Sequence, residues 1–439
     1  MQKPKPGYKL VKSLFGKYLS IPEDWSQITI KEIVDKTIDN RGKTPPLSDR
    51  GYELIEIASI TNKSKYPDFS FVTKYVDEQT YNTWFRDGHP KPNDILISTV
   101  GSVGQSVLIK ENRGCIAQNI IGLEINEKVD SIFIYYLLNS KYISQYINSV
   151  LMGLAQPSLR VPHFLKCTIH IPPKTEQQKI ASILSSVDDL ISSYDDIIET
   201  TKLLKTGLMQ TLLTKGIGHK KFKKVKWLFG KELEIPEEWE IFKISIIATQ
   251  KGIKTGPFGS SLVESELNGT DVRVLFPEDI KTGCITQNGK RITKEKFEEL
   301  KEFEVKSDDV IISLMGTIGK IGRVSTNIGK AIISKHLLKI TVARELCLPQ
   351  FLITVLNSFS IQSQMNTQSQ GLTMKGLNTK IIKNLQGIFP KTHEQQKIIS
   401  VLSTIDSKIY DLESKKTHLE SLKKGLMQIL LTGQIRVKI

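Results

Sequence analysis

The sequence predicts an α+β fold in which two globular domains are separated by a long antiparallel two-helix coiled coil, with an approximate two-fold internal repeat. Three observations predict this fold. Two sequence blocks occur twice in the same order, the second block has the apolar spacing of a coiled-coil helix, and short β-branched stretches dominate the segments between the blocks. The length of 439 residues suits two to four domains and leaves room for both copies.

The repeat defines the predicted domain boundaries. VKSLFGKYLSIPEDW at 11–25 recurs as VKWLFGKELEIPEEW at 225–239, with 11 of 15 positions identical. A second block starts with EQQKI at Glu176 and at Glu394, and it ends with GLMQTLLT or GLMQILLT. Solenoid repeats are much shorter, so we interpret the pattern as duplication of a whole unit. The predicted parts are a first globular domain with its N-terminal segment, a first helix, a lysine-rich linker, a second globular domain, a second helix and a tail, at residues 1–175, 176–216, 217–235, 236–393, 394–433 and 434–439.

The two shared helices are predicted to pair along one apolar seam. Apolar positions recur at alternating intervals of four and three, which is typical of a coiled coil, and at ~1.5 Å per residue each helix is about 50 Å long. A two-fold axis across the pair makes the helices antiparallel, with Lys205 facing Ile405 and Lys423 facing Val187. A parallel homodimer uses the same pattern and remains an alternative. The predicted seam residues are Ile180, Leu184, Val187, Ile191, Ile198, Leu208, Leu212, Ile398, Leu402, Ile405, Ile409, Leu412, Leu419, Leu426 and Leu430.

The segments between the shared blocks are predicted to be α+β. Each begins with a short β-rich run after its tryptophan, continues into a loop that contains glycine and proline, and then alternates short strands with loops. A helical pattern follows in each copy, at 131–149 and at 348–365. The two segments match poorly, except that NDILISTVGSVG at 93–104 aligns with DDVIISLMGTIG at 308–319. We therefore expect two domains of one fold that present different surfaces.

The composition points to a polyanionic partner. Lys and Arg together number 61 against 46 Asp and Glu, which gives a net charge of +15 and favours nucleic acid as a partner. No apolar run is long enough to cross a membrane, and the N-terminus lacks the apolar stretch of a signal peptide. The cysteines have no zinc-finger spacing, which predicts a reduced, cytoplasmic protein without a metal site; they are Cys115, Cys167, Cys284 and Cys347.

Polar loops at corresponding places in the two copies supply candidate DNA-binding residues. The motif S-x-x-G-[ST]-x-G follows an apolar strand in both copies, where its hydroxyls could bind phosphate or base edges; a tight turn required by the fold explains it at least equally well. The other candidates are polar or basic side chains of neighbouring loops. The candidates are Arg41, Lys43, Thr44, Ser98, Thr99, Ser102, Gln118, Asn119, Gln156, Ser158, Arg160, Lys251, Lys254, Ser260, Ser261, Ser313, Thr317, Lys320, Lys335, His336, Lys375 and Asn378.

A lysine-rich stretch lies at 215–231 and contains no acidic residue before position 232. Lysine without arginine suits attraction to phosphates more than base readout. A solvated linker explains such a stretch equally well. We expect the attraction to DNA to be strongest around this stretch and the second domain.

No catalytic motif is present. The sequence contains no G-x-x-x-x-G-K-[ST] loop, no G-x-G-x-x-G after a strand, no G-x-S-x-G, and no histidines at metal-ligand spacing. Together with the duplicated basic architecture, this indicates a component that recognises a target and leaves the chemistry to other proteins.

The doubled IPEDW and IPEEW motifs, the D-[IV]-[IL]-I-S strand before G-[ST]-x-G, the EQQKI helix starts and the GLMQxLLT helix ends carry a family resemblance over nearly the whole chain. The chain resembles the specificity subunits of type I restriction–modification systems. The resemblance implies two target recognition domains, a role in phage defence, and partnership with two modification subunits and two restriction subunits. It further implies that adenine methylation with S-adenosylmethionine, and ATP- and magnesium-dependent cleavage, belong to those partners, with no cofactor in this chain.

The function expected on these grounds is non-catalytic binding of an asymmetric, bipartite double-stranded DNA target, with no membrane partner. Two alternatives remain. The first is a coiled-coil protein that bridges DNA without enzymatic partners, and the second is an enzyme whose site carries no familiar motif.

Overall fold

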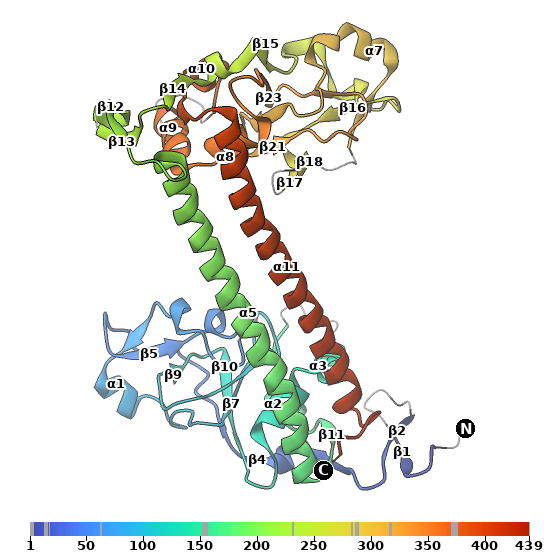
Figure 1. Ribbon diagram of the computed structural model, residues 1–439. Coiled ribbons are helices and arrows are strands. Elements are labelled where there is room, and N and C mark those ends of the chain that lie inside the picture. The colour runs from blue at the N-terminus through green and yellow to red at the C-terminus, as the bar shows by residue number, and fades with distance from the viewer. Residues whose placement is uncertain are drawn as a thin grey trace. The chain divides into compact units, whose positions relative to one another are not determined.

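The computed structural model describes residues 4–12, 16, 18–61, 64–151, 157–230, 232–281, 284–285, 289–315, 318–369 and 376–438. Its contacts divide the chain into two compact units. Unit 1 is residues 1–195 with 414–439, and unit 2 is residues 196–413 (Figure 1). The division cuts both long helices, so each unit contains one part of each of them.

Unit 1 combines short strands with a few helices and the beginning of the first long helix. Its elements are β1 (Tyr8–Lys12), β2 (Tyr18–Pro22), β3 (Ser26–Thr29), β4 (Val34–Ile38), β5 (Tyr52–Ile55), β6 (Tyr75–Val76), α1 (Glu78–Thr83), β7 (Ile95–Ser98), β8 (Ser106–Leu108), β9 (Cys115–Ile116), β10 (Ile120–Ile125), α2 (Ser131–Leu138), α3 (Lys141–Leu151), α4 (Val161–Leu165), β11 (Thr168–Ile171) and the first half of α5 (Lys174–Lys215).

Unit 2 repeats this plan. Its elements are β12 (Phe222–Lys226), β13 (Glu232–Pro236), β14 (Glu240–Lys243), α6 (Ile244–Ile247), β15 (Ala248–Thr255), β16 (Val272–Leu275), β17 (Ile280–Lys281), β18 (Cys284–Ile285), β19 (Arg291–Ile292), α7 (Lys294–Glu299), β20 (Val310–Ser313), β21 (Ile321–Arg323), β22 (Ala331–Ile333), β23 (Leu337–Val342), α8 (Pro349–Leu356), α9 (Phe359–Ser369), α10 (Thr379–Asn384), β24 (Gln386–Phe389) and the first half of α11 (Thr392–Leu430).

The central sheets of the two units have the same strand order and register. Unit 1 has the order β4-β10-β7-β8, and unit 2 has β15-β23-β20-β21, continued by β18 and β17. Ile120 lies opposite Ser98 in the first sheet, and Leu337 lies opposite Ser313 in the second. The predicted internal repeat is therefore confirmed at the level of individual strand pairs.

The central strand of each sheet is buried on both faces. In β7, Ile95 and Ile97 pack with Phe133 of α2, whereas Leu96 packs with Ile116 on the opposite face. Adjacent residues of a strand point to opposite faces, so burial of both faces explains why ILIS reads as a continuous apolar run. This strand fixes the position of the S-x-x-G motif that follows it.

The helical patterns predicted at 131–149 and 348–365 are confirmed, and each is divided into two helices. In unit 1 the Ser140 Oγ accepts a hydrogen bond from Ile143 N, and the Asn139 amide donates to Tyr135 O and Ser106 Oγ. Asn357 donates in the same way to Ile353 O in unit 2. Serine and asparagine bond to nearby backbone and so end one helix and start the next.

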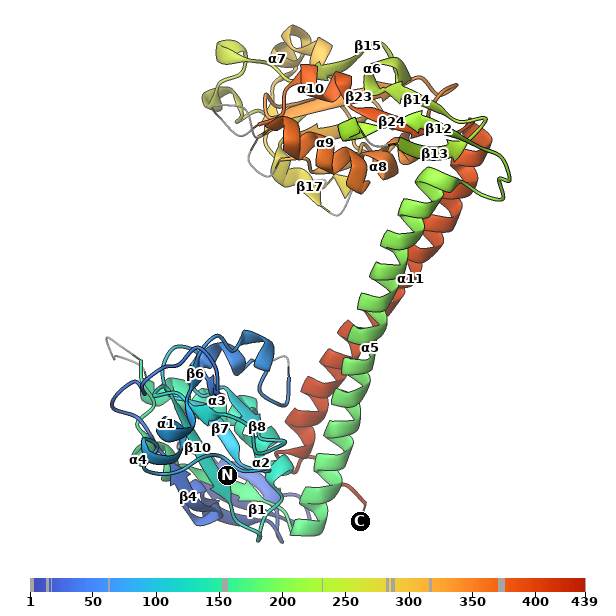
Figure 2. The same cartoon turned by 90° about the vertical axis from the view of Figure 1, so that its left-hand side faces the viewer.

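The two long helices lie side by side in both units (Figure 2). Lys423 Nζ is 2.6 Å from Asp188 Oδ1 in unit 1, and Lys205 Nζ is 2.5 Å from Asp406 Oδ1 in unit 2. A late position of one helix therefore meets an early position of the other. The predicted antiparallel pairing is confirmed within each unit, and each lysine binds the carboxylate next to the apolar residue that it was predicted to face.

The predicted seam residues are all buried or half-buried. Ile180 and Leu184 in unit 1, and Ile398 and Leu402 in unit 2, are 0–4% exposed and belong to the cores of their units. The seam is thus continuous with the two cores, and each buried aliphatic side chain stabilises its unit by about 1.5–3 kcal/mol. Surface ion pairs beside it contribute less, at most about 1 kcal/mol each.

The segment at 217–235, predicted as a lysine-rich linker, contains an antiparallel hairpin of β12 and β13. Lys224 lies opposite Glu234, and Lys226 lies opposite Glu232. Opposite charges on facing strands attract, so part of the positive charge of this stretch is compensated within the hairpin itself. The expectation that DNA attraction is strongest here stays a prediction, with less charge available to carry it.

Candidate nucleic-acid interface

The S-x-x-G loop of unit 1 is closed by its own first serine. Ser98 is fully buried, its Oγ donates to Ser102 O, and it accepts from Gln105 N at 3.1 Å. Gly101 and Gly104 have φ of +73° and +85°, a region that glycine enters readily. A Cβ on Gly104 would lie 2.6 Å from the Ile147 side chain. These contacts support the tight-turn interpretation of the serine.

The corresponding loop of unit 2 is closed in the same way. Ser313 is fully buried, its Oγ accepts from Lys320 N at 2.9 Å, and its carbonyl accepts from Gly319 N at 2.9 Å. In unit 1, Gly104 N likewise donates to Ser98 O at 2.9 Å. Two matching hydrogen bonds, one to the serine hydroxyl and one to its carbonyl, therefore hold both loops, although the residues between the fixed positions differ. The repeated positions build the loop, and the variable ones are free to differ in what they present.

Two further loops join each S-x-x-G loop. In unit 1, Thr99 N donates to Asn119 O at 2.8 Å and Leu159 N donates to Thr99 O at 2.8 Å. In unit 2, Leu314 N donates to His336 O at 2.8 Å and Leu377 N donates to Leu314 O at 3.0 Å. Three predicted segments, far apart in sequence, thus meet at one end of the central sheet in each unit.

The loops that follow β4 in unit 1 and β15 in unit 2 lie at the same end of the central sheet as the S-x-x-G loops. Thr44 Oγ1 lies 3.3 Å from Gln118 Oε1 in unit 1. In unit 2, Gly256 N donates to Leu337 O at 3.1 Å, and a Cβ on Gly256 would lie 2.3 Å from Ser334 O. Each unit therefore gathers four loops into one polar surface, which we call the loop surface. It is defined in unit 1 by residues 39–44, 98–105, 117–119 and 158–160, and in unit 2 by the described residues 254–261, 313–315, 318–320, 334–336 and 376–378.

Most of the predicted DNA-binding residues lie on the two loop surfaces, with different freedom to bind a ligand. Thr99 is buried with its hydroxyl on Asn119 O, and Asn378 caps α10 by accepting from Ile381 N. Lys251 lies apart from the loops, on the irregular part of β15, with φ of +60°. The exposed members are Lys43, Thr44, Ser102, Arg160, Lys251, Ser261, Lys335 and Asn378, the half-buried ones are Arg41, Gln118, Asn119, Ser158, Lys254, Lys320 and His336, and Gln156, Thr317, Lys375 and the Ser260 side chain lie outside the described residues.

Three residues that belong to the loop surfaces or bind to them were missed in the sequence. Asp39 binds the Arg41 guanidinium at 2.6 Å, Arg86 donates to two carbonyls of the same loop, and Glu302 binds Lys254 at 2.6 Å. Arg86 and Glu302 are 45 to 48 positions away from their partners, so no local motif points to them. Asp39 is two residues from Arg41, and the D-x-R spacing was the available signal.

Outside the loops, the EQQK motifs fix the starts of the long helices. Gln177 donates to Pro172 O and accepts from Asp130 N, and Gln395 donates to Pro390 O and accepts from Leu348 N. Glu394 accepts hydrogen bonds from Ile217 N at 3.1 Å and Trp239 Nε1 at 3.0 Å. The shared motifs therefore serve the architecture of each unit.

The Glu394 carboxylate is also 2.7 Å from His219 Nε2. Burial alone raises the pKa of Glu394, but its bonds to His219, Ile217 and Trp239 outweigh burial and lower it. The carboxylate therefore stays ionised and holds together the segment after α5 and the start of α11 in unit 2.

The thiols of the described cysteines are buried and have little tendency to ionise. Cys115, Cys167 and Cys347 are free, and burial raises the pKa of each to about 12. Among the residues that the structure describes, no group of three or more His, Cys, Asp or Glu side chains is arranged to hold a metal. A search of the same residues for a helix long and apolar enough to span a membrane finds none.

Two units of one fold, each with four loops at the end of a central sheet and a share of an antiparallel helix pair, define an internally duplicated two-domain protein. The family model of the type I restriction modification DNA specificity domain matches residues 22–202 and 236–421. The chain belongs to this family. The matched model is a recognition domain and not a catalytic one, in agreement with the prediction of a non-catalytic chain.

Curated relatives match nearly the whole chain. The type I restriction enzyme MjaVIII specificity subunit of Methanocaldococcus jannaschii is 27% identical over 431 residues, covering 96% of this chain and 95% of the relative. The type I restriction enzyme EcoBI specificity subunit of Escherichia coli is 23% identical, covering 98% and 89%. The predicted resemblance to specificity subunits is thereby confirmed.

Solved structures share the fold. A chain from a study of complex assembly and conformational transition of the type I restriction–modification system has a TM-score of 0.58 at 13% identity, covering 94% of this chain and 99% of that one. The type I restriction–modification S subunit of M. genitalium has a TM-score of 0.52 at 16% identity, covering 94% and 96%. At these identities the likeness concerns the fold alone.

Proposed function

We propose that the chain binds an asymmetric, bipartite double-stranded DNA target and directs partner subunits of a type I restriction–modification complex to it. The observation that supports this most is the pair of loop surfaces. Their backbones are held by matching hydrogen bonds, whereas their side chains differ: Asn119 stands where unit 2 has His336, and Thr99 where unit 2 has Leu314. Two like scaffolds with unlike side chains suit two unlike half-sites.

In this proposal the chemistry belongs to the partners. Two modification subunits bind S-adenosylmethionine and methylate adenine, and two restriction subunits use ATP and magnesium. This chain supplies no cofactor and no catalytic group. Such a complex acts on intracellular DNA, so the proposal places the chain in the cytoplasm.

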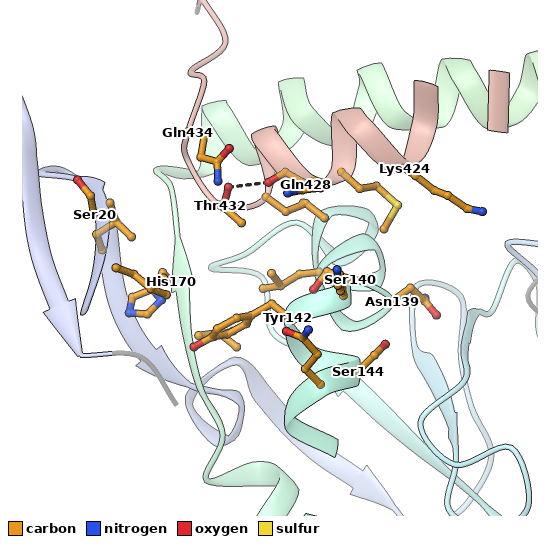
Figure 3. Close-up of a pocket in the computed structure, with 18 of the residues that line it drawn as sticks. Ser20, Asn139, Ser140, Tyr142, Ser144, His170, Lys424, Gln428, Thr432 and Gln434 are labelled. Atoms are coloured by element: carbon orange, nitrogen blue, oxygen red, sulfur yellow. Dashed lines mark hydrogen bonds between the residues drawn. The ribbon is translucent and has the colours of Figure 1, made fainter. Parts of the chain in front are cut away.

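A cavity in unit 1 supports the partner part of the proposal. It measures about 880 Å³ and contains none of the predicted DNA-binding residues. Figure 3 shows Gln428 and Thr432, from the end of α11 and just after it, on one side and Ser140 and Tyr142 on the other. None of its lining residues belongs to the loop surface of unit 1, so it is not a candidate for reading the target.

Eight of the 19 residues that line this cavity recur in unit 2. Unit 2 has the identical residue at the corresponding position for Leu19, Ile21, Asn139, Ser140, Met427, Gln428, Leu431 and Thr432. The loop surfaces differ between the units, whereas these residues are kept. One surface motif present twice in a chain suits two copies of one partner, as the proposed pair of modification subunits requires.

Co-expression and methylation mapping test the proposal. The chain is expressed with its cognate modification subunit in a host without other adenine methylation, and methylated adenines are mapped across the genome. The expected result is co-purification of the subunits and methylation in one interrupted, asymmetric sequence. Absence of a co-purifying methyltransferase, with DNA binding retained, would instead support a stand-alone DNA-bridging protein. S-adenosylmethionine binding or ATP hydrolysis by the isolated chain would point to an enzyme.

A further inference from the structure

The loop after β4 presents an arginine whose guanidinium is held in one orientation. Arg41 Nε donates to Asp39 Oδ1 at 2.7 Å, and Arg41 Nη2 donates to Asp39 Oδ2 at 2.6 Å. Two parallel hydrogen bonds fix the plane of the guanidinium as well as its position. Bonding to Arg41 keeps the pKa of the Asp39 carboxyl low despite partial burial, so the pair stays ionised.

The orientation leaves the far edge of the guanidinium available. Arginine has five N–H groups, and the pair with Asp39 uses one on Nε and one on Nη2. The second N–H of Nη2 and one N–H of Nη1 form a parallel pair at the end of the guanidinium, and no partner for this pair or for the other N–H of Nη1 occurs among the described residues. The Arg41 side chain is 32% exposed, so this edge can be reached from solvent.

A second arginine holds the loop that carries Arg41. Arg86 Nη2 donates to Asp39 O at 3.2 Å and to Arg41 O at 3.0 Å. Asp87 N donates to Asn40 Oδ1, and Asp39 N donates to Asp87 Oδ2, both at 3.1 Å. The backbone on either side of the Arg41 side chain is thus tied to residues 86–87.

The segment that contains Arg86 is itself anchored in unit 1. Phe85 is 7% exposed and packs with Leu54 and Val76. The His89 ring stacks on the Tyr81 ring at a centroid distance of 3.6 Å, and its Nε2 lies 2.8 Å from Tyr81 O. Anchors on both sides of Arg86 make this a rigid support, as a recognition group needs if it is to be pre-organised.

An arginine held in this way is suited to a base more than to a phosphate. A phosphate contact needs only charge and tolerates a mobile side chain, as the exposed Lys43 two residues later could provide. Recognition of guanine requires two parallel N–H groups aimed at O6 and N7 in the major groove. The free edge of Arg41 offers such a pair, and the Thr44 contact with Gln118 joins its loop to the rest of the loop surface.

We propose that Arg41 reads a guanine in the half-site bound by unit 1, and that Asp39 and Arg86 are positioning residues that orient its guanidinium. This inference rests on the proposed function, because it assumes that the loop surface of unit 1 binds DNA. It goes further by naming the reading residue, the base and the supporting groups.

Unit 2 holds a different cation at the corresponding end of its first sheet strand. Lys254 Nζ is 2.6 Å from Glu302 Oε2 and lies over the Phe303 ring. An ammonium is a point charge without a planar fork, so it cannot make the same bidentate contact. Lys254 therefore provides the control position for a charged residue that is paired with a carboxylate but is not expected to read guanine bidentately.

Selection from a randomised duplex library tests the inference. The full-length chain, in the complex with its modification subunit, selects bound sequences, and each position of the recovered site is scored for base preference. The variants are Arg41→Lys, which keeps the charge, Asp39→Asn and Arg86→Gln, which leave Arg41 in place, and the controls Lys43→Ala and Lys254→Gln.

The expected result is that Arg41→Lys removes the preference for guanine at one position of one half-site, with about 10- to 100-fold loss of affinity for the selected site. Asp39→Asn and Arg86→Gln weaken the same position to a smaller extent. Lys43→Ala lowers affinity for all sequences alike and reduces the salt slope by about one. Lys254→Gln leaves that position unchanged.

Two results would overturn the inference. The first is an unchanged base preference in Arg41→Lys, with the wild type still selecting a bipartite site; this outcome leaves the proposed function intact. The second is a uniform loss of affinity in all three variants without change at any one position, which would make the pair a structural clamp. A wild-type complex that selects no sequence would contradict both the inference and the proposed function.

Discussion

Arg436 Nη2 lies 2.6 Å from Glu176 Oε2, although 260 positions separate the two residues in the chain. Glu176 is fully buried at the start of α5, and Arg436 also binds Asp24 with two hydrogen bonds. The segment after α11 is therefore fastened to the beginning of unit 1. His219, which follows α5, makes the equivalent contact with Glu394 in unit 2. In each unit, therefore, a residue that follows one long helix binds the start of the other long helix.

Replacing Arg436 with alanine should destabilise unit 1. The change leaves the buried Glu176 carboxylate without its main cation, and loss of one partner of a buried ion pair costs about 3–5 kcal/mol. Because Arg436 is itself partly exposed, we expect the lower end of this range. Chemical denaturation measures the effect. Adding Glu176→Gln to Arg436→Ala should recover part of the loss, and a double variant no more stable than Arg436→Ala would contradict this explanation.

The apolar seam should dominate the stability of the helix pair. Leu184 is fully buried in the core of unit 1, and Leu184→Ala should cost about 2–5 kcal/mol through lost burial and the cavity that it leaves. Leu203 lies on the same helix but is 73% exposed, so Leu203→Ala should change the free energy of unfolding by less than about 0.5 kcal/mol. Thermal or urea unfolding of both variants provides the comparison. Similar losses in the two would mean that the seam is assigned to the wrong face.

The first serine of the S-x-x-G loop should contribute to the free energy of unfolding. Ser313→Ala removes the acceptor of the Lys320 N–H, and a buried donor without a partner costs about 1–3 kcal/mol. Ser261 is exposed on the same loop surface, so Ser261→Ala should leave the unfolding midpoint nearly unchanged. If Ser313→Ala lowers DNA affinity with no loss of stability, the serine is a DNA ligand and the turn interpretation is wrong.

Asp94 should make stability fall with rising pH across a defined window. Burial raises the pKa of Asp94 from 3.8 to about 6, against the hydrogen bond from Lys91 N. The folded state then binds the proton more tightly than the unfolded state, so the contribution of Asp94 to stability is greatest below pH 3.8, decreases up to about pH 6 and is constant above.

Asp94→Asn keeps an acceptor for Lys91 N and removes the charge. The stability of this variant relative to the wild type should therefore increase from pH 4 to pH 6 and then stay level. Denaturation at a series of pH values measures it, with Glu127→Gln, a change at an exposed carboxylate, as the control. A difference that does not vary with pH would show that Asp94 is not held in its protonated form.

The large-scale fold could be predicted because its signals are periodic or repeated. The four–three spacing from Ile180 identifies the helix seam, and the doubled blocks identify two like units. The breaks at Asn139 and Asn357 were missed because a polar residue inside an apolar pattern does not show whether its side chain bonds to the backbone. The hairpin at 222–236 was missed because its many lysines hide the alternation of apolar and polar residues along each strand. Val225 in the first strand and Leu233 in the second are apolar positions of that alternation.

The candidate site was predictable only in outline. The S-x-x-G loops were found because they occur twice, and the neighbouring loops because they carry polar residues at matching places. That Ser98 is committed to the loop while Arg41 keeps a free edge depends on hydrogen-bond geometry, which residue types do not reveal. Arg86, which supports Arg41, is joined to it by contacts across 45 positions.

Exchange of the two variable segments tests the central claim most directly. Residues 40–160 and 254–378 are swapped within the chain, and the methylated adenines of cells that express it with its modification subunit are mapped and compared with the wild type. Reading of one half-site by each unit predicts the same two half-sites in the reverse order, with the interruption between them retained. Continued methylation of the original sequence by the swapped chain would contradict it.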